Sequence, residues 1–185
     1  MIDYGKIAKS LEYFQELGYT RIEAPWWVSE EVINITKPEG TGSYSVKENN
    51  KMLVGSGEQS FLYMAAKDRL PKGKYVTTTP CFRNESIGGL HKKCFIKTEI
   101  IITDDVESKV FDISEQALEF FKLIVPDKNK LNTVLTEEGV DINYGNIEIG
   151  SYGLRSCPFL TWIYGTACAE PRLSKAISQI EFKDN

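Results

Sequence analysis

The stretch "TTTPCFRNESIGGLHKKCFIKTEII", residues 77–101, decides the fold. Two strand-like runs flank a glycine-containing turn in it, which predicts an antiparallel hairpin. Since alternate side chains of a strand share a face, Arg83 and Glu85 point the same way, and Phe95 can join them from the second run. A guanidinium, a carboxylate and an aromatic ring on one face can hold a phosphate, an amine and a base. The hairpin therefore indicates either a nucleotide site built on a sheet or a surface ion pair beside a core phenylalanine.

Segments with helical and strand-like patterns alternate on both sides of this hairpin. Apolar residues recur at helical spacing before Gly18, and Asp112 with Glu115 forms a capping box ahead of a dense apolar run. The polar residues 126–145 predict a connection with little regular structure. Strands joined by hairpins, with helices at intervals, favour an α+β fold, an antiparallel β-sheet flanked by helices. The expected helices cover residues 3–17, 58–70, 112–125 and 172–180, and the expected strands cover 20–24, 75–82, 93–103, 146–150 and 161–167.

Length and composition limit the class of protein. The 185 residues predict one domain, 1–185, with a sizeable core. The formal charge of −4 argues against a general polyanion-binding protein, although eight basic residues gather between Lys67 and Lys97 with only two acids among them. The four cysteines form no CxxC pair and His91 is the only histidine, so we expect reduced thiols rather than a zinc site. An amphipathic N-terminus and the lack of a membrane-spanning apolar run predict a cytoplasmic protein that does not act at a membrane.

Two segments nearer the C-terminus carry further candidate groups. "WIYGTACAEPRLSKAI", residues 162–177, passes from a strand through small residues into a helix that starts at Pro171 and carries Arg172. Small residues at alternate positions let a ligand approach the backbone, where Arg172 can reach a phosphate. "EIGSYGLR" places Glu148 and Arg155 on either side of a small-residue turn. A strand-borne glutamate is a ligand that hard cations prefer, although a lone glutamate is more often simply solvated.

Three stretches, in this order, resemble the three motifs of the class II aminoacyl-tRNA synthetase/biotin ligase-like catalytic core. "LGYTRIEAPWWVS" is similar to the motif that builds the family's dimer interface. "FRNE", a short loop and "HKKCF" match the pattern FRxE…[RH]xxxF, and "YGTACAEPRL" resembles the small-residue strand and arginine of the last motif. The resemblance spans nearly the whole chain. It implies a homodimeric ligase that uses ATP and Mg²⁺ to convert an amino acid to its adenylate, with release of pyrophosphate.

The resemblance also implies a role for each matching residue of the ATP site. Arg83 would bind the α-phosphate and the substrate carboxylate, and Arg172 would hold the γ-phosphate, so these two are the candidate catalytic residues. Glu85 would meet the adenine amino group, and Phe95 would stack on the ring. His91 would face the β- and γ-phosphates. The site would act by electrostatic positioning.

Three more residues concern the substrate and the metal. By the same resemblance, Glu58 in "GSGEQSF" would receive the substrate's α-amino group, Glu148 would coordinate Mg²⁺ and Arg155 would read the substrate side chain. The short loop, the "FRNE" wording and the order of Glu148 and Arg155 resemble the aspartyl, asparaginyl and lysyl branch and ammonia-dependent asparagine synthetase. "TPCFR" resembles the seryl enzymes instead. The acceptor could be tRNA, ammonia or another amine.

Some features depart from the family and leave alternatives open. No anticodon-binding domain is expected, and Ala167 and Ala169 stand where glycines are common. A non-catalytic paralog, acting as a regulatory or binding subunit, is the alternative to an enzyme, although such paralogs usually lose the charged residues that are retained here. A different nucleotide-binding fold is disfavoured because neither GxxxxGK[ST] nor a strand–GxGxxG–helix signature occurs. Trp26 and Trp27 are expected in the core or in the dimer interface.

Overall fold

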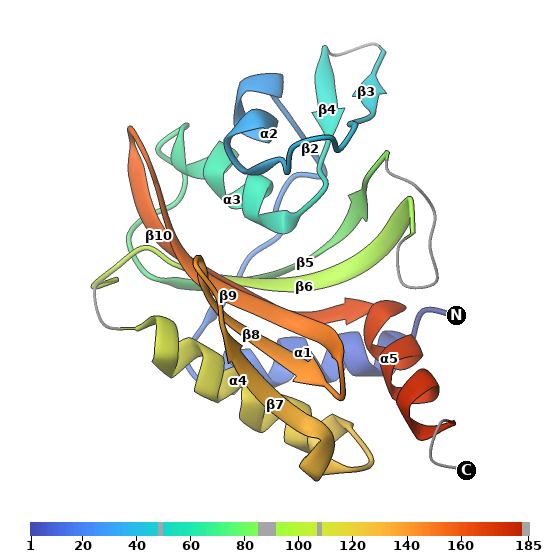
Figure 1. Cartoon of the computed structure of the whole chain (residues 1–185). Coiled ribbons are helices and arrows are strands. Elements are labelled where there is room, and N and C mark those ends of the chain that lie inside the picture. Colours follow the sequence, from blue (N-terminus) through green and yellow to red (C-terminus); the bar gives the residue numbers. More distant parts are fainter. Residues whose placement is uncertain (48–49, 85–91, 107–108, 183–185) are drawn as a thin grey trace.

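A seven-stranded sheet forms the centre of the computed structural model, which describes residues 1–47, 50–84, 92–106 and 109–182 (Figure 1). Its strand order is β1-β5-β6-β10-β9-β8-β7, and every neighbouring pair is antiparallel except β1 with β5. The predicted α+β fold, an antiparallel sheet flanked by helices, is confirmed. The strands are β1 (Thr20–Arg21), β5 (Lys74–Phe82), β6 (Cys94–Ile102), β7 (Leu131–Leu135), β8 (Gly139–Tyr144), β9 (Ile147–Cys157) and β10 (Leu160–Glu170).

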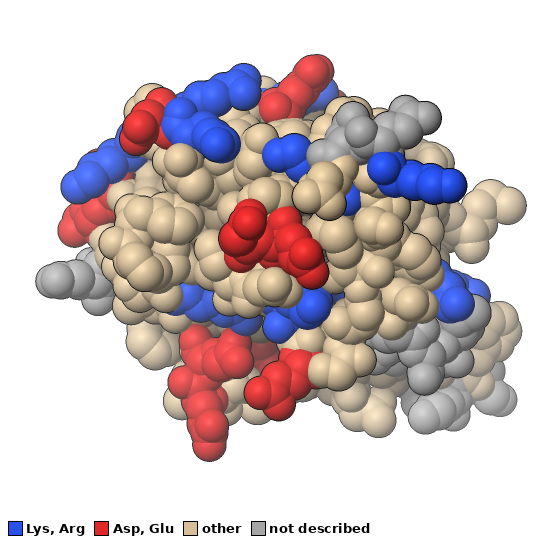
Figure 2. Space-filling view, turned by 90° about the horizontal axis from the view of Figure 1, so that it is seen from above, with Lys and Arg blue, Asp and Glu red and all other residues tan. Residues whose placement is uncertain are grey.

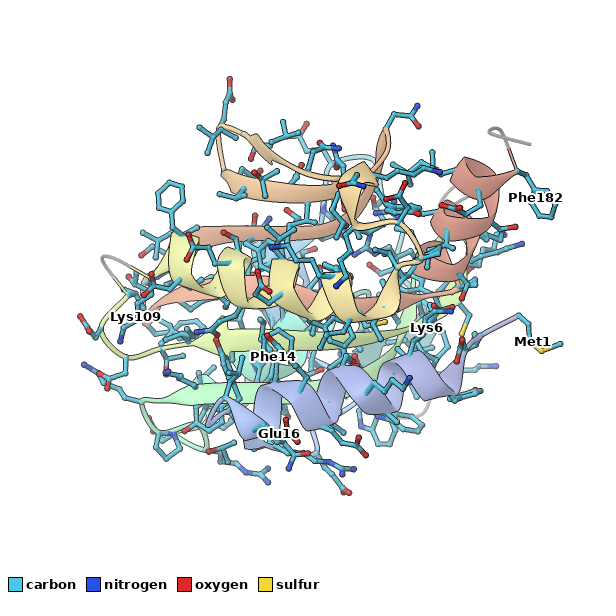
Figure 3. The ribbon with its side chains drawn as sticks, turned by 90° about the horizontal axis from the view of Figure 1, so that it is seen from below. Met1, Lys6, Phe14, Glu16, Lys109 and Phe182 are labelled. Carbon is cyan, nitrogen blue, oxygen red and sulfur yellow. The ribbon has the colours of Figure 1, made fainter. Side chains whose placement is uncertain are left out.

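Helices α1 (Tyr4–Glu16), α4 (Val110–Ile124) and α5 (Arg172–Glu181) pack on one face of this sheet, as the view from below shows (Figure 3). Asp3 caps α1 by accepting from the amides of Gly5 and Lys6 at 3.0 and 3.2 Å. The core on this face contains Phe14, which is fully buried and meets the Tyr19 ring edge-on at 5.3 Å between centroids. These aromatic contacts hold α1 and α4 to the sheet.

A smaller layer covers part of the other face. It consists of α2 (Glu30–Thr36), α3 (Gly57–Ala65) and a three-stranded sheet of β2 (Trp27–Val28), β4 (Lys51–Leu53) and β3 (Ser45–Val46). A second core forms there around Phe61 and Trp162. Because both faces are covered, the run Ile100 to Ile102 on β6 is apolar without alternation: Ile101 joins this second core, and its two neighbours join the first.

Several of the predicted elements differ from the structure. Glu148 and Arg155 do not flank a turn, because both lie on one continuous strand, β9. Residues 126–145 are not irregular, because Val140, Ile142 and Tyr144 alternate inward on β8, which pairs with β7 and β9. The predicted capping box is wrong, since α4 begins earlier, at Val110, and lacks a side-chain cap. The helix expected over 58–70 ends at Ala65. The alternation of β8 was overlooked in the sequence because its three apolar residues stand among polar ones.

Several expectations from composition can be compared with the surface. Trp26 and Trp27 are 52% and 47% exposed, so placing them in the core is wrong. All four cysteines are free thiols. Among the described residues, no helix is both long and apolar enough to cross a membrane. On the face seen from above, basic and acidic side chains are interspersed rather than gathered by sign (Figure 2).

Candidate functional site

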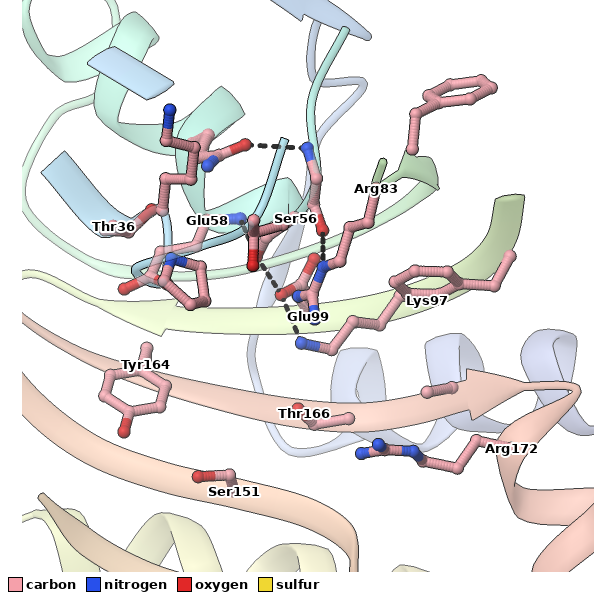
Figure 4. A pocket seen from close by; sticks show the side chains of 18 of the residues that line it. Thr36, Ser56, Glu58, Arg83, Lys97, Glu99, Ser151, Tyr164, Thr166 and Arg172 are labelled. Atoms are coloured by element: carbon pink, nitrogen blue, oxygen red, sulfur yellow. Dashed lines mark hydrogen bonds and ion pairs between the residues drawn. The ribbon is translucent and has the colours of Figure 1, made fainter. Parts of the chain in front are cut away.

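A cavity of about 290 Å³ lies between the open part of the sheet and the α2–α3 layer (Figure 4). The structure brings together in its lining all the predicted site residues that it describes. Glu85 and His91 lie outside the described residues, so their predicted roles have no structural counterpart here. The predicted residues in the lining are Glu58, Arg83, Phe95, Glu148, Arg155 and Arg172.

The floor of the cavity is built from alternate side chains of the central strands. Phe95, Lys97 and Glu99 come from β6, and Tyr164 and Thr166 come from β10. A register shift in β10 after Thr166 changes the alternation. Ala169 therefore lines the cavity where an unbroken alternation would have placed Cys168.

Arg83 and Phe95 form one end of the cavity, at the end of the hairpin where β5 finishes and β6 begins. The Arg83 Nε donates to the Gly55 carbonyl at 2.9 Å, and the guanidinium carbon lies 5.3 Å from the centroid of the Phe95 ring. The terminal nitrogens of Arg83 make no hydrogen bond to another residue within the described ranges. This end thus presents a positioned guanidinium beside an aromatic ring.

Arg172 reaches the same cavity from the start of α5, and its Nη1 lies 3.0 Å from Glu148 Oε1 on β9. Its helix is anchored by Glu170, whose buried carboxylate accepts from the Ser174 amide at 3.2 Å and the Ser174 hydroxyl at 2.9 Å. Glu170 thereby supplies the N-terminal cap that Pro171 lacks. Burial raises the pKa of the Glu170 carboxyl. The sequence interpretation missed this positioning role.

Glu58 and Arg155 face each other at another part of the lining. Glu58 accepts from Arg155 Nη1 at 2.8 Å and from the Trp162 indole at 2.7 Å. Glu58 is only 6% exposed, and this burial raises the pKa of its carboxyl in spite of both partners. The other terminal nitrogen of Arg155 donates to Glu138 at 2.8 Å, while its guanidinium lies 4.0 Å from the Tyr164 ring centroid. Glu138 and Trp162 were also missed from sequence.

Lys97 and Glu99 form a third polar group on the cavity floor that sequence reasoning missed. The Lys97 ammonium donates to Glu99 at 2.7 Å, and Ser56 and the Gly57 amide donate to the same carboxylate from the start of α3. Figure 4 shows Arg83 and Lys97 converging from the two strands of the hairpin, with Arg172 approaching from α5. The sequence could have indicated Lys97 and Glu99 as lining residues, because they alternate with Phe95 along one strand and alternate side chains share a face.

The basic segment noted in the sequence does not form one surface. Lys67 lies over the Tyr63 ring, and Lys74 lies over the Tyr19 ring. Arg83, Lys92 and Lys97 line the cavity. Only the last part of the segment can therefore attract an anion to the site.

The described ranges contain no group of three or more histidine, cysteine or acidic side chains placed to hold a metal ion. Glu148 is nevertheless a half-exposed carboxylate in a cavity that three arginines also line. Mg²⁺ in phosphate sites is usually bound by one or two carboxylates together with substrate phosphates. The donor set thus fits a Mg²⁺ ion that arrives with a nucleotide, rather than one held by protein ligands alone.

Comparison with known proteins identifies solved structures of the same fold. No protein-family model and no curated protein matches the chain. Seryl-tRNA synthetase from Pyrococcus horikoshii, complexed with ATP, matches with a TM-score of 0.70 and 18% identity, over 95% of this chain and 50% of that one. PylSc, a pyrrolysyl tRNA synthetase from Desulfitobacterium hafniense, gives 0.69 and 16%, over 92% and 67%. Cytoplasmic serine-tRNA ligase from Naegleria fowleri in complex with AMP gives 0.65 and 15%, over 91% and 46%.

The chain therefore has the fold of the class II aminoacyl-tRNA synthetase catalytic core, as the three motifs predicted. It spans about half the length of the two seryl enzymes. The structures named here are seryl and pyrrolysyl enzymes, so similarity to the aspartyl, asparaginyl and lysyl branch stays a prediction.

Proposed function

We propose that the chain is an ATP-dependent ligase that activates an amino acid as its adenylate and releases pyrophosphate. The observation that carries the proposal is the convergence of Arg83, Phe95 and Arg172 with Glu58 and Arg155 on one cavity of a class II core. These residues come from distant parts of the sequence. The P. horikoshii neighbour is complexed with ATP, and the N. fowleri neighbour with AMP.

The proposed mechanism is attack of the amino acid carboxylate on the α-phosphorus, which breaks the bond to the leaving pyrophosphate. Arg83 holds the carboxylate and the α-phosphate close together and disperses their negative charge, while the Phe95 ring stacks on adenine. Arg172 holds the γ-phosphate from the other side. Glu85 at the adenine amino group and His91 at the β- and γ-phosphates complete the proposed ATP site.

Glu148 is the proposed protein ligand of Mg²⁺. Bound Mg²⁺ would neutralise phosphate charge and favour departure of pyrophosphate. In this chain Glu148 also sets the position of Arg172 through the 3.0 Å contact, so the carboxylate has two uses in the same site.

Glu148→Gln is expected to raise the Mg²⁺ concentration for half-maximal ATP–pyrophosphate exchange by about tenfold, because the amide is a much weaker metal ligand. Exchange is measured over a Mg²⁺ titration at fixed ATP. Asp141→Asn, on neighbouring strand β8 and outside the cavity lining, is the matched control and should leave the titration unchanged. An unaltered Mg²⁺ requirement in the Glu148 variant would remove this residue as a metal ligand.

The proposed substrate is an amino acid of the aspartate or asparagine kind, as the wording of the second motif and the order of Glu148 and Arg155 indicate. The acceptor of the activated acyl group is tRNA, ammonia or another amine. The non-catalytic alternative gains no support from the site, since Arg83, Glu148 and Arg172 all line one cavity.

The decisive experiment is amino-acid-dependent exchange of pyrophosphate into ATP with Mg²⁺, screened over the standard amino acids. Exchange with one amino acid, or one related group, is expected. Folded protein that exchanges with none of them would count against amino acid activation and in favour of a regulatory paralog.

We also propose that the chain forms a homodimer through the segment that resembles the first motif. Trp26 and Trp27 are about half exposed there, and large aromatic side chains are enriched in protein interfaces. Sedimentation at micromolar concentration is expected to give twice the chain mass, and Trp27→Glu should shift it toward the monomer. A monomeric mass for the unaltered protein would contradict the proposal.

A further inference from the structure

We propose that the cluster of Glu58, Arg155 and Glu138 excludes acidic amino acids and selects a substrate whose side chain donates hydrogen bonds. This inference rests on the proposed function and narrows its substrate class. It favours the amide over the acid within the aspartate and asparagine pair.

The cluster holds one cation between two anions. Arg155 directs one terminal nitrogen at Glu58 and the other at Glu138, both at 2.8 Å. The two acids and one base give a net charge of −1 at neutral pH when all three are ionised. The Arg155 contact lowers the pKa of the Glu138 carboxyl, which keeps that residue ionised. The charge of Arg155 is thus already balanced by carboxylates of the chain, and little of it remains to attract a further carboxylate.

Geometry also prevents Arg155 from gripping an acidic side chain with its fork. A bidentate grip requires two nitrogens aimed at one carboxylate, and both terminal nitrogens are already engaged by different carboxylates. The Tyr164 ring, 4.0 Å from the guanidinium carbon, covers one of its faces. An aspartate side chain would have to displace Glu138 and would then lie beside it as a like charge.

Lys97, the cation next to this cluster on the cavity floor, is not available to bind an acidic side chain in place of Arg155. The Lys97 ammonium is 2.7 Å from Glu99, which is only 4% exposed. Arg83 and Arg172 belong to the proposed phosphate site. By contrast, a side-chain amide, hydroxyl or ammonium can donate to Glu58, which lines the cavity, without displacing Arg155 from it.

The test compares matched pairs of substrates that differ in charge but little in shape. Exchange is measured with aspartate and asparagine, with glutamate and glutamine, and with serine, threonine and lysine. Binding of the aspartyl and asparaginyl sulfamoyl-adenosines, which mimic the adenylate and need no catalysis, is measured by calorimetry. The asparaginyl compound is expected to bind at least tenfold more tightly than the aspartyl compound.

Glu138→Gln removes one negative charge and weakens the contact that holds one terminal nitrogen of Arg155. It is expected to reduce the asparaginyl to aspartyl preference at least threefold. Glu137→Gln, the exposed neighbour in the same turn, is the control and should leave the preference unchanged.

The outcomes separate this inference from the function on which it rests. Exchange with a donor side chain but with neither acid supports both. Exchange or tighter binding with an acid overturns the inference while the proposed function stands. An unchanged preference in the Glu138 variant overturns the role of the cluster. No exchange with any amino acid, together with no binding of either analogue, overturns the proposed function itself.

Discussion

Replacing either Arg83 or Arg172 with alanine is expected to lower amino-acid-dependent ATP–pyrophosphate exchange by at least ~100-fold, the usual loss when a preorganised charge-stabilising group is removed. Arg83 has terminal nitrogens without a hydrogen bond to another described residue, so its charge remains for a ligand. Arg172 approaches from α5 and is held near the cavity by Glu148. Lys97 does not readily replace either group, because its ammonium is paired with Glu99.

Both alanine variants should stay folded, since these arginines are partly exposed. The Arg172–Glu148 ion pair contributes about 0–1 kcal/mol to stability. Circular dichroism and sedimentation check this. Arg69→Ala removes an exposed arginine outside the cavity and is the matched control, which should retain full exchange. Near-normal turnover in the Arg83 or Arg172 variant would remove that residue from the mechanism.

Comparison of Arg83 and Arg172 with Arg155 shows which features of the site can be predicted from the sequence. Motif order and spacing placed Arg83, Phe95 and Arg172 in one cavity, because each lies at a fixed offset from a strand or helix end. The resemblance to the family also implied that Arg155 reads the substrate side chain. Its actual partners, Glu58 and Glu138, lie 97 and 17 residues away along the chain, and no local pattern reveals such contacts.

The fold was predicted where the hydrophobic pattern was strong, and the two strands β7 and β8 at one side of the sheet were missed. The hairpin of β5 and β6 was evident, since both strands are long and rich in β-branched residues. The edge strand β7 is mostly exposed and has no apolar pattern of its own, so it depends on its pairing with β8. The capping of α5 by Glu170 was also missed, although its contact with Ser174 is local, four residues along the chain.

Phe14→Ala is expected to lower the free energy of unfolding by about 3–5 kcal/mol, the usual range for a fully buried phenylalanine. The Phe14 ring extends from α1 and packs against Tyr19, just before β1, and Phe120 on α4. The centroid distances are 5.3 Å to Tyr19 and 6.4 Å to Phe120. Its removal leaves a cavity beneath the central sheet that rigid neighbours cannot fill. Urea unfolding, followed by circular dichroism, measures the loss.

Tyr4→Ala on the same helix is the matched control, because that ring is 66% exposed and its loss should change stability by no more than about 0.5 kcal/mol. Equal unfolding midpoints for Phe14→Ala and the unaltered protein would contradict the packing of α1. If the alanine variant does not accumulate, Phe14→Leu should give a smaller loss in the same direction. Phe14 lies on the sheet face away from the cavity, so protein that remains folded should keep its KM for ATP. A variant that stays fully stable but loses ATP affinity would show instead that α1 acts on the site directly, through the Asp3 amide that lies 3.4 Å from Glu170.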